Sequence, residues 1–159
     1  MTPVLRLLRC VVEWLVMGLT GMLVVTVSAN VFARYLFLSG LVWAEELARI
    51  GFVWVVFLGA YVALTRGNHL AIRLVTDRVP ARHRRAVRTV SGLLMLAFLG
   101  TVAWYGSVLV ARTVAFGRVT PILGISAAWG YAAVPVSSAL MFVHVLHLLL
   151  SGSETDQGQ

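Results

Sequence analysis

Two glutamates and an arginine lie against one of the most apolar stretches of the chain, LVWAEELARIGFVWVVFLGAYVALTRGNH, from Leu41 to His69. Glu45, Glu46 and Arg49 are candidate functional residues, because an ionisable side chain at a membrane-spanning segment marks a functional site by default. Three interpretations compete: coupling of ions or protons, a shielded network that docks a partner or supports the fold, and ordinary charges at the membrane interface. Coupling needs carboxylates that water reaches from both sides in turn, whereas these lie at one end of the apolar run. We therefore favour docking or scaffolding over coupling, and the interfacial interpretation stays open.

Helical spacing indicates how these charges are shielded. Glu45 lies i,i+4 and Glu46 lies i,i+3 to Arg49, so both can pair with it on one helix. Arg34 precedes them across a short loop and supplies a second positive charge. We expect two carboxylates to face two arginines, which leaves no net charge.

Other ionisable residues have simpler explanations. Glu13 resembles the single carboxylate of small proton-coupled exporters, but it follows Arg9 by one turn, which favours a local i,i+4 pair. His144 and His147 lie i,i+3, and with His69 they could supply haem ligands from two helices; we favour histidines without a redox role. The sequence shows no phosphate loop, nucleophile triad or metal-ligand cluster. We therefore expect no enzyme and no catalytic, cofactor-binding or metal-binding residue.

Composition identifies the elements that must position these residues. The chain has 159 residues, 60% hydrophobic and 12% charged, against roughly 45–50% apolar residues in a soluble domain. Four apolar segments are long enough to cross the hydrocarbon core, and none alternates like a barrel strand. We predict an all-α integral membrane protein whose single domain, residues 1–150, has spans at about 11–33, 42–64, 89–110 and 125–150. The tail, 151–159, is predicted to be disordered.

The distribution of arginine predicts the orientation. The N-terminal segment and the connection 65–88 together carry nine arginines, whereas the other side carries three, Arg34, Arg112 and Arg118. Basic residues of short loops stay in the cytoplasm, so both termini and the connection 65–88 are predicted to be cytoplasmic. Within this connection we expect a short interfacial element, then a basic lead that contacts lipid headgroups through Arg82, Arg84, Arg85 and Arg88.

Small residues recur on one face of the second segment, among them Gly51 and Gly59. Small residues allow close helix approach in a membrane, so this face packs either within the chain or against another subunit. In the fourth segment, Pro135 lies midway along the span and is expected to kink it.

Two stretches resemble a known family. RYLFLSGLVWAEELARIGFVWVVFLGAYVALTRGNHLAI, Arg34 to Ile72, is similar to the central signature of the small membrane subunit of tripartite ATP-independent periplasmic (TRAP) transporters, the DctQ-like family. TPILGISAAWGYAAVPVSSALMF, Thr120 to Phe142, resembles the second recurring stretch of that family. The chain departs from the family pattern at Ile125-Ser126, where Ile-Pro is common. Length and span number agree, so the resemblance covers nearly the whole chain.

The resemblance implies a non-catalytic scaffold subunit of the bacterial inner membrane. It implies two protein partners, a large multi-helix membrane subunit with the substrate and sodium sites and a periplasmic binding protein that delivers an organic acid. Sodium-coupled symport would then belong to the large subunit, and no cofactor is expected on this chain. The residues expected to dock the partner or support the fold are Arg34, Glu45, Glu46, Arg49, Gly51, Gly59, His69, Trp129 and Pro135. A haem-binding electron carrier and a stand-alone proton-coupled exporter remain the alternatives.

Overall fold

Four long helices make up almost all of the part that the computed structural model describes, residues 3–37, 40–76 and 81–151. The helices are α1 (Pro3–Phe37), α2 (Val42–Thr76), α3 (Ala81–Ala115) and α4 (Ala128–Ser151). Each contains an apolar segment long enough to cross a membrane, at Leu7–Leu36, Val42–Arg66, Thr89–Ala115 and Ala128–Leu150. The predicted all-α fold with four membrane-spanning helices is confirmed. Of the predicted tail, 151–159, the first residue is the last one of α4, and 152–159 lie outside the described residues.

The first three helices extend beyond the predicted spans, whereas α4 begins at Ala128, three residues after its predicted start at 125, because Ile125 and Ser126 belong to the preceding loop. α2 continues to Thr76 and α3 begins at Ala81, so most of the segment 65–88, expected as an interfacial element and a basic lead, belongs to these two helices. The prediction of a separate short element there was wrong. Hydropathy marks where a helix leaves the hydrocarbon core, whereas the backbone hydrogen bonding of a helix can continue into the polar region beyond it.

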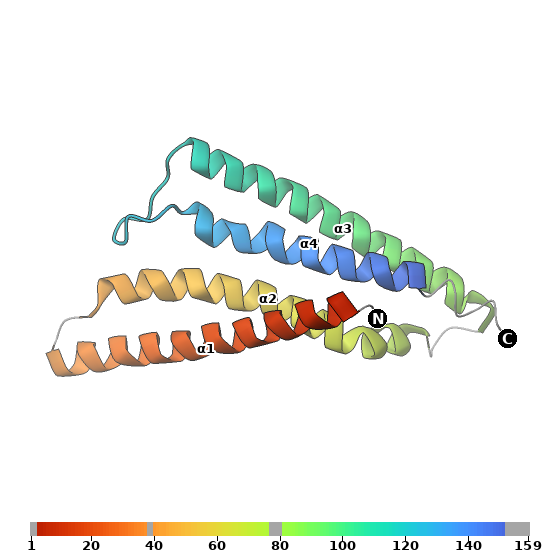
Figure 1. Ribbon diagram of the computed structural model, residues 1–159, viewed down its shortest axis with the longest axis horizontal. Coiled ribbons are helices and arrows are strands. Elements are labelled where there is room, and N and C mark those ends of the chain that lie inside the picture. Colours follow the sequence, from red (N-terminus) through yellow and green to blue (C-terminus); the bar gives the residue numbers. More distant parts are fainter. Residues whose placement is uncertain (1–2, 38–39, 77–80, 152–159) are drawn as a thin grey trace.

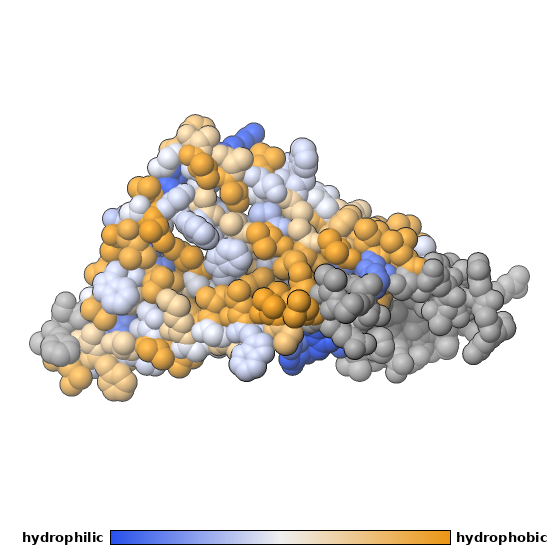
Figure 2. Space-filling view, in the orientation of Figure 1, coloured by the Kyte–Doolittle hydropathy of each residue, from blue (hydrophilic) through white to orange (hydrophobic). Residues whose placement is uncertain are grey.

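The helices form a row in the order α1, α2, α4, α3 (Figure 1). Helix α1 packs on α2, α2 packs on α4, and α4 packs on α3. The apolar span of α4 is the most buried, at 33%, against 6% in α1 at the edge of the row. The row therefore has two broad faces and two edges, and the face seen in Figure 2 is largely hydrophobic.

Glycines let α3 approach α4 closely. A Cβ atom on Gly106 would lie 3.1 Å from Cδ of Pro135, and one on Gly92 would lie 2.6 Å from Cδ2 of Leu149. Leu99, seven residues from each of these glycines, is also buried, so packed positions recur every seven residues along α3. Helix α4 continues through Pro135.

A small core joins α1, α2 and α4. Val12, Leu58 and Tyr61 are buried together, and Leu140 of α4 packs against them. The ring of Tyr61 also meets the ring of His144 edge to face, with centroids 6.3 Å apart. This core connects the pair of α1 and α2 to the pair of α3 and α4.

Candidate partner-docking site

Glu46 lies in the second turn of α2 and holds the loop between α3 and α4. Its side chain is only 8% exposed, and Oε2 accepts hydrogen bonds from the backbone N–H of Leu123, at 2.7 Å, and of Ile122, at 3.2 Å. A carboxyl oxygen that accepts two backbone N–H groups satisfies donors that the turn itself leaves unpaired. Glu46 thus connects two parts of the chain that are distant in sequence. We call this end of the row, where the α1–α2 turn and the α3–α4 loop lie, the loop end.

The α3–α4 loop itself is a small hairpin. Val119 pairs with Ser126 in an antiparallel bridge, and the N–H of Thr120 donates to the carbonyl of Ile125 at 2.7 Å. Gly124, with a φ of 64°, allows the tight turn, since this left-handed conformation is strained for other residues. The hairpin thereby presents the two N–H groups that Glu46 accepts.

The α1–α2 turn is fixed by two polar contacts. Nη2 of Arg34 donates to Oε1 of Glu45 at 2.6 Å. Both side chains of this ion pair are more than half exposed. Oδ1 of Asn30 accepts the backbone N–H of Leu41 at 2.7 Å. The expected contribution of Arg34 to the cluster is therefore present in the structure, whereas Asn30 carried no signal that would have singled it out.

Arg49 does not pair with the two glutamates as spacing suggested. Its side chain is exposed and makes no ion pair with any residue that the structure describes, because Glu45 points to Arg34 and Glu46 points to the loop. The predicted Glu45–Arg49 and Glu46–Arg49 pairs were wrong. The i,i+3 and i,i+4 positions only permit contact, and partners brought close by the tertiary fold have replaced them.

Trp129, at the start of α4, meets α2. The indole N–H of Trp54 donates to the backbone carbonyl of Trp129 at 3.0 Å, while the Trp129 side chain is exposed. Trp54 was not expected to have this role. The hydrogen bond of Trp54 thus connects α2 to the pair of α3 and α4 about two turns beyond Glu46.

A second polar cluster lies toward the opposite end of the row. Oε1 of Glu13 accepts from Nε of Arg9 at 2.8 Å and from Nε of Arg66 at 3.2 Å. The expected local pair of Arg9 and Glu13 is present, and Arg66 of α2 adds a bridge between helices that the sequence analysis missed. The carboxylate of Glu13 is therefore occupied by two arginines.

Gly51 and Gly59 have different surroundings. A Cβ on Gly51 would lie 3.3 Å from Cδ2 of Leu23, so this part of the small-residue face packs on α1 within the chain. A Cβ on Gly59 would have open space around it. The small-residue face therefore packs within the chain at Gly51. At Gly59 it is open to another subunit or to lipid.

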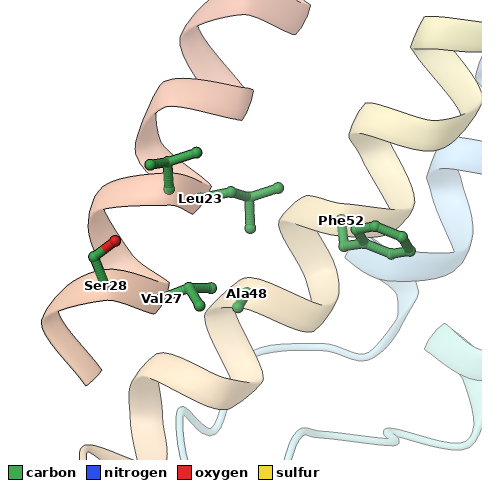
Figure 3. A pocket seen from close by; sticks show the side chains of 6 residues that line it. Leu23, Val27, Ser28, Ala48 and Phe52 are labelled. Atoms are coloured by element: carbon green, nitrogen blue, oxygen red, sulfur yellow. The ribbon is translucent and has the colours of Figure 1, made fainter. Parts of the chain in front are cut away.

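An open groove of about 500 Å³ separates α1 from α2 near Gly51. Figure 3 shows Leu23, Val27 and Ser28 of α1 on one side and Ala48 and Phe52 of α2 on the other. An organic acid would need a cation or several N–H donors there, and the lining residues that the structure describes provide one hydroxyl and no charge. The groove suits an apolar group, not a carboxylate substrate.

The side chains of several predicted site residues lie outside the described residues. These are His69 and the four arginines expected at lipid headgroups, Arg82, Arg84, Arg85 and Arg88. Their predicted roles stay predictions. In the described parts of the chain, no group of three or more His, Cys, Asp or Glu residues could hold a metal ion.

Comparison with known proteins places this arrangement in a family. Residues 23–155 match the family described as tripartite ATP-independent periplasmic transporters, DctQ component. The sialic acid TRAP transporter small permease protein SiaQ of Vibrio cholerae is 25% identical over 151 residues, which cover 92% of this chain and 86% of that protein. The sialic acid TRAP transporter permease protein SiaT of Haemophilus influenzae is 34% identical over 115 residues, 71% of this chain and 18% of that protein. The isethionate TRAP transporter permease protein DctMQ of Oleidesulfovibrio alaskensis is 29% identical over 105 residues, 66% of this chain and 16% of that protein.

The match covers most of this chain, whereas this chain spans less than a fifth of the length of the SiaT and DctMQ proteins. The family match and the four apolar helices together indicate a multi-pass protein of the bacterial inner membrane. The chain belongs to the DctQ family and is a small permease subunit of a TRAP transporter, a transport component and not an enzyme.

Proposed function

We propose that this chain is a fixed scaffold for a large membrane subunit in a sodium-coupled TRAP transporter. The large subunit would carry the transport path for an organic acid, and a periplasmic binding protein would deliver that substrate. In this arrangement the loop end faces the periplasm and both termini face the cytoplasm, in line with the arginine distribution.

The observation that carries the proposal is the open row of helices, in which the carboxylates of the described residues lie toward the two ends and are already paired. Glu46 and Glu45 are occupied at the loop end, and Glu13 is occupied by two arginines toward the other end. A transported ion or acid needs a reachable polar site near the middle of the membrane. The row instead offers broad apolar surfaces, which suit contact with another membrane subunit.

The relatives support a large partner. SiaT and DctMQ are named permease proteins, and the part of each that resembles this chain makes up 18% and 16% of its length. A segment like this chain is thus joined there to a much longer part of a permease. We propose that the corresponding part is a separate subunit that binds this chain.

Reconstitution tests the proposal. Proteoliposomes that contain this chain alone should take up no organic acid under an inward sodium gradient, whereas liposomes with this chain, the large subunit and the binding protein should. The two membrane subunits should also co-purify in mild detergent. Uptake by this chain alone, or complete absence of binding to the large subunit, would contradict the scaffold role.

A further inference from the structure

Two aromatic residues with polar groups lie at an unusual depth in α3. Trp104 and Tyr105 are 70% and 69% exposed, although tryptophan and tyrosine in membrane proteins concentrate at the two interfaces. With a rise of 1.5 Å per residue, Trp104 lies about 16 Å from the end of the span at Ala115 and about 22 Å from its start at Thr89. The hydrocarbon core is about 30 Å thick, so both residues lie near its middle.

The neighbouring helix contact agrees with this depth. Gly106, the next residue along α3, packs against Pro135, which lies well inside the span Ala128–Leu150 of α4. The two aromatic side chains are therefore far from water and headgroups on either side.

The polar groups of these side chains are unsatisfied within the chain. The indole N–H of Trp104 and the phenol O–H of Tyr105 have no hydrogen-bond partner among the residues that the structure describes. Nearby short hydroxyl side chains, in contrast, bond to their own helix: Thr101 donates to the carbonyl of Ala97 at 2.8 Å, and Ser107 donates to that of Ala103 at 2.7 Å. An N–H or O–H group without a partner in hydrocarbon carries a large desolvation penalty, which lipid chains cannot relieve.

These groups lie on a free flank of the molecule. Helix α3 forms one edge of the row and packs mainly on α4 (Figure 1). Leu94, Phe98 and Tyr105 lie on one face of α3 at spacings of four and seven residues, and all three are exposed, so they form a largely apolar stripe that ends at the Tyr105 hydroxyl group. Arg112 lies two turns beyond Tyr105 on the same face of α3. It is also exposed and has no ion pair with any described residue.

We infer that this edge of α3 docks on a transmembrane helix of the large subunit that presents hydrogen-bond acceptors at the depth of Trp104 and Tyr105. The inference rests on the proposed function and adds to it which edge is covered and by which chemistry. Lipid chains would suit Leu94 and Phe98 but have no acceptor for the two donors. A second copy of this chain, packed α3 against α3, is a poor match, since α3 between Thr89 and Val110 carries no carboxyl or amide side chain and its hydroxyls at Thr101 and Ser107 already bond to their own helix. The partner helix must therefore supply a carbonyl, carboxyl or hydroxyl oxygen in mid-membrane.

Aromatic substitutions that remove a polar group test the inference. Tyr105→Phe removes only the hydroxyl group, and Trp104→Phe removes the indole N–H. Tyr35→Phe and Trp14→Phe are matched controls, because these side chains are 81% and 70% exposed but lie beside the charged residues at the helix ends. All four variants keep exposed aromatic rings, so each should fold and melt like the wild-type chain.

The measurement is the dissociation constant between this chain and the large subunit in detergent. Interhelical hydrogen bonds in membranes correspond to a roughly three-fold to ten-fold change in binding, so we expect weakening of that size for Tyr105→Phe and for Trp104→Phe. The two controls should stay within about two-fold of wild type. If wild type binds the large subunit and the two α3 variants bind as well as the controls, the inference is wrong while the proposed function stands. If wild type does not bind at all, both fail.

A photo-crosslinking residue at position 105 identifies what covers this edge. In membranes that contain both subunits, we expect a product with the combined mass of this chain and the large subunit, and little such product from position 35. A product of twice the mass of this chain, or crosslinking to lipid alone, would overturn the inference even if the two subunits co-purify.

Discussion

Replacing Glu46 should release the α3–α4 loop while leaving the four helices in place. The carboxyl oxygen Oε2 is the acceptor for both the N–H of Leu123 and the N–H of Ile122. Glu46→Ala removes this acceptor and leaves both donors to water or to no partner. The helices depend on other contacts, notably the core around Tyr61 and the close approach of α3 to α4.

The size of the effect follows from those two hydrogen bonds. A hydrogen bond to a charged group contributes about 1.5–3 kcal/mol, and water that reaches the exposed side of the hairpin recovers part of the loss. We expect the docked loop to lose about 2–4 kcal/mol in Glu46→Ala. Glu46→Gln keeps an acceptor of the same shape and should lose about 1 kcal/mol, because a neutral acceptor is roughly half as strong.

Hydrogen–deuterium exchange of the loop amides measures this loss directly. A loss of about 2–4 kcal/mol raises the exchange of Ile122 and Leu123 by about 30-fold to several hundred-fold if the loop opens locally. Glu45→Ala is the control: its ion pair with Arg34 is solvent-exposed and contributes only about 0–1 kcal/mol, so loop exchange should change little.

The opposite outcome would refute the reasoning. If loop exchange in Glu46→Ala stays within about three-fold of wild type, the two N–H groups are protected by something other than this carboxyl group. If the whole chain unfolds instead, the loop is part of the global folding unit and does not open separately.

Three further changes test other parts of the structure. Gly106→Val should lower the free energy of unfolding by about 1–3 kcal/mol because its new atoms have no space against α4, whereas Gly59→Val, in open space, should change the melting temperature of the isolated chain little. Arg49→Ala should change the stability of the isolated chain by less than about 0.5 kcal/mol but lower co-purification of the large subunit; unchanged co-purification would make Arg49 an ordinary interfacial charge. A cysteine probe at Arg118 should react with an impermeant reagent from the periplasm and one at Arg84 only after lysis, and labelling of the latter in intact cells would reverse the proposed orientation.

The sequence predicted the number and nature of the helices well, since composition reports directly on the solvent that a segment must tolerate. A run such as Val42 to Leu64 has few alternatives in a membrane, because every backbone group must be paired within the segment. The ends were less accurate. Helix α2 extends to Thr76, and the polar residues that end a hydropathy window do not end a helix.

The partners of the charged residues were harder to predict. Local spacing correctly indicated the pair of Arg9 and Glu13, which depends only on one turn of helix. It could not indicate that Arg66 joins them, or that Glu46 accepts N–H groups from a loop far along the chain. Such contacts depend on which helices are neighbours, and the row order of α1, α2, α4 and α3 is not encoded in any local pattern.

The long separation in sequence between Glu46 and its two donors has a consequence for biogenesis. Ile122 and Leu123 follow Glu46 by 76 and 77 residues. At about 5–20 residues per second, a ribosome needs about 4–15 s to synthesise that stretch, and during this time α2 exists without the loop that it holds. A carboxyl group in mid-membrane would face hydrocarbon throughout that interval, whereas Glu46, in the second turn of α2, can remain hydrated at the interface until the second helix pair arrives. Its place at the end of the span thus makes a late contact compatible with early insertion of α2.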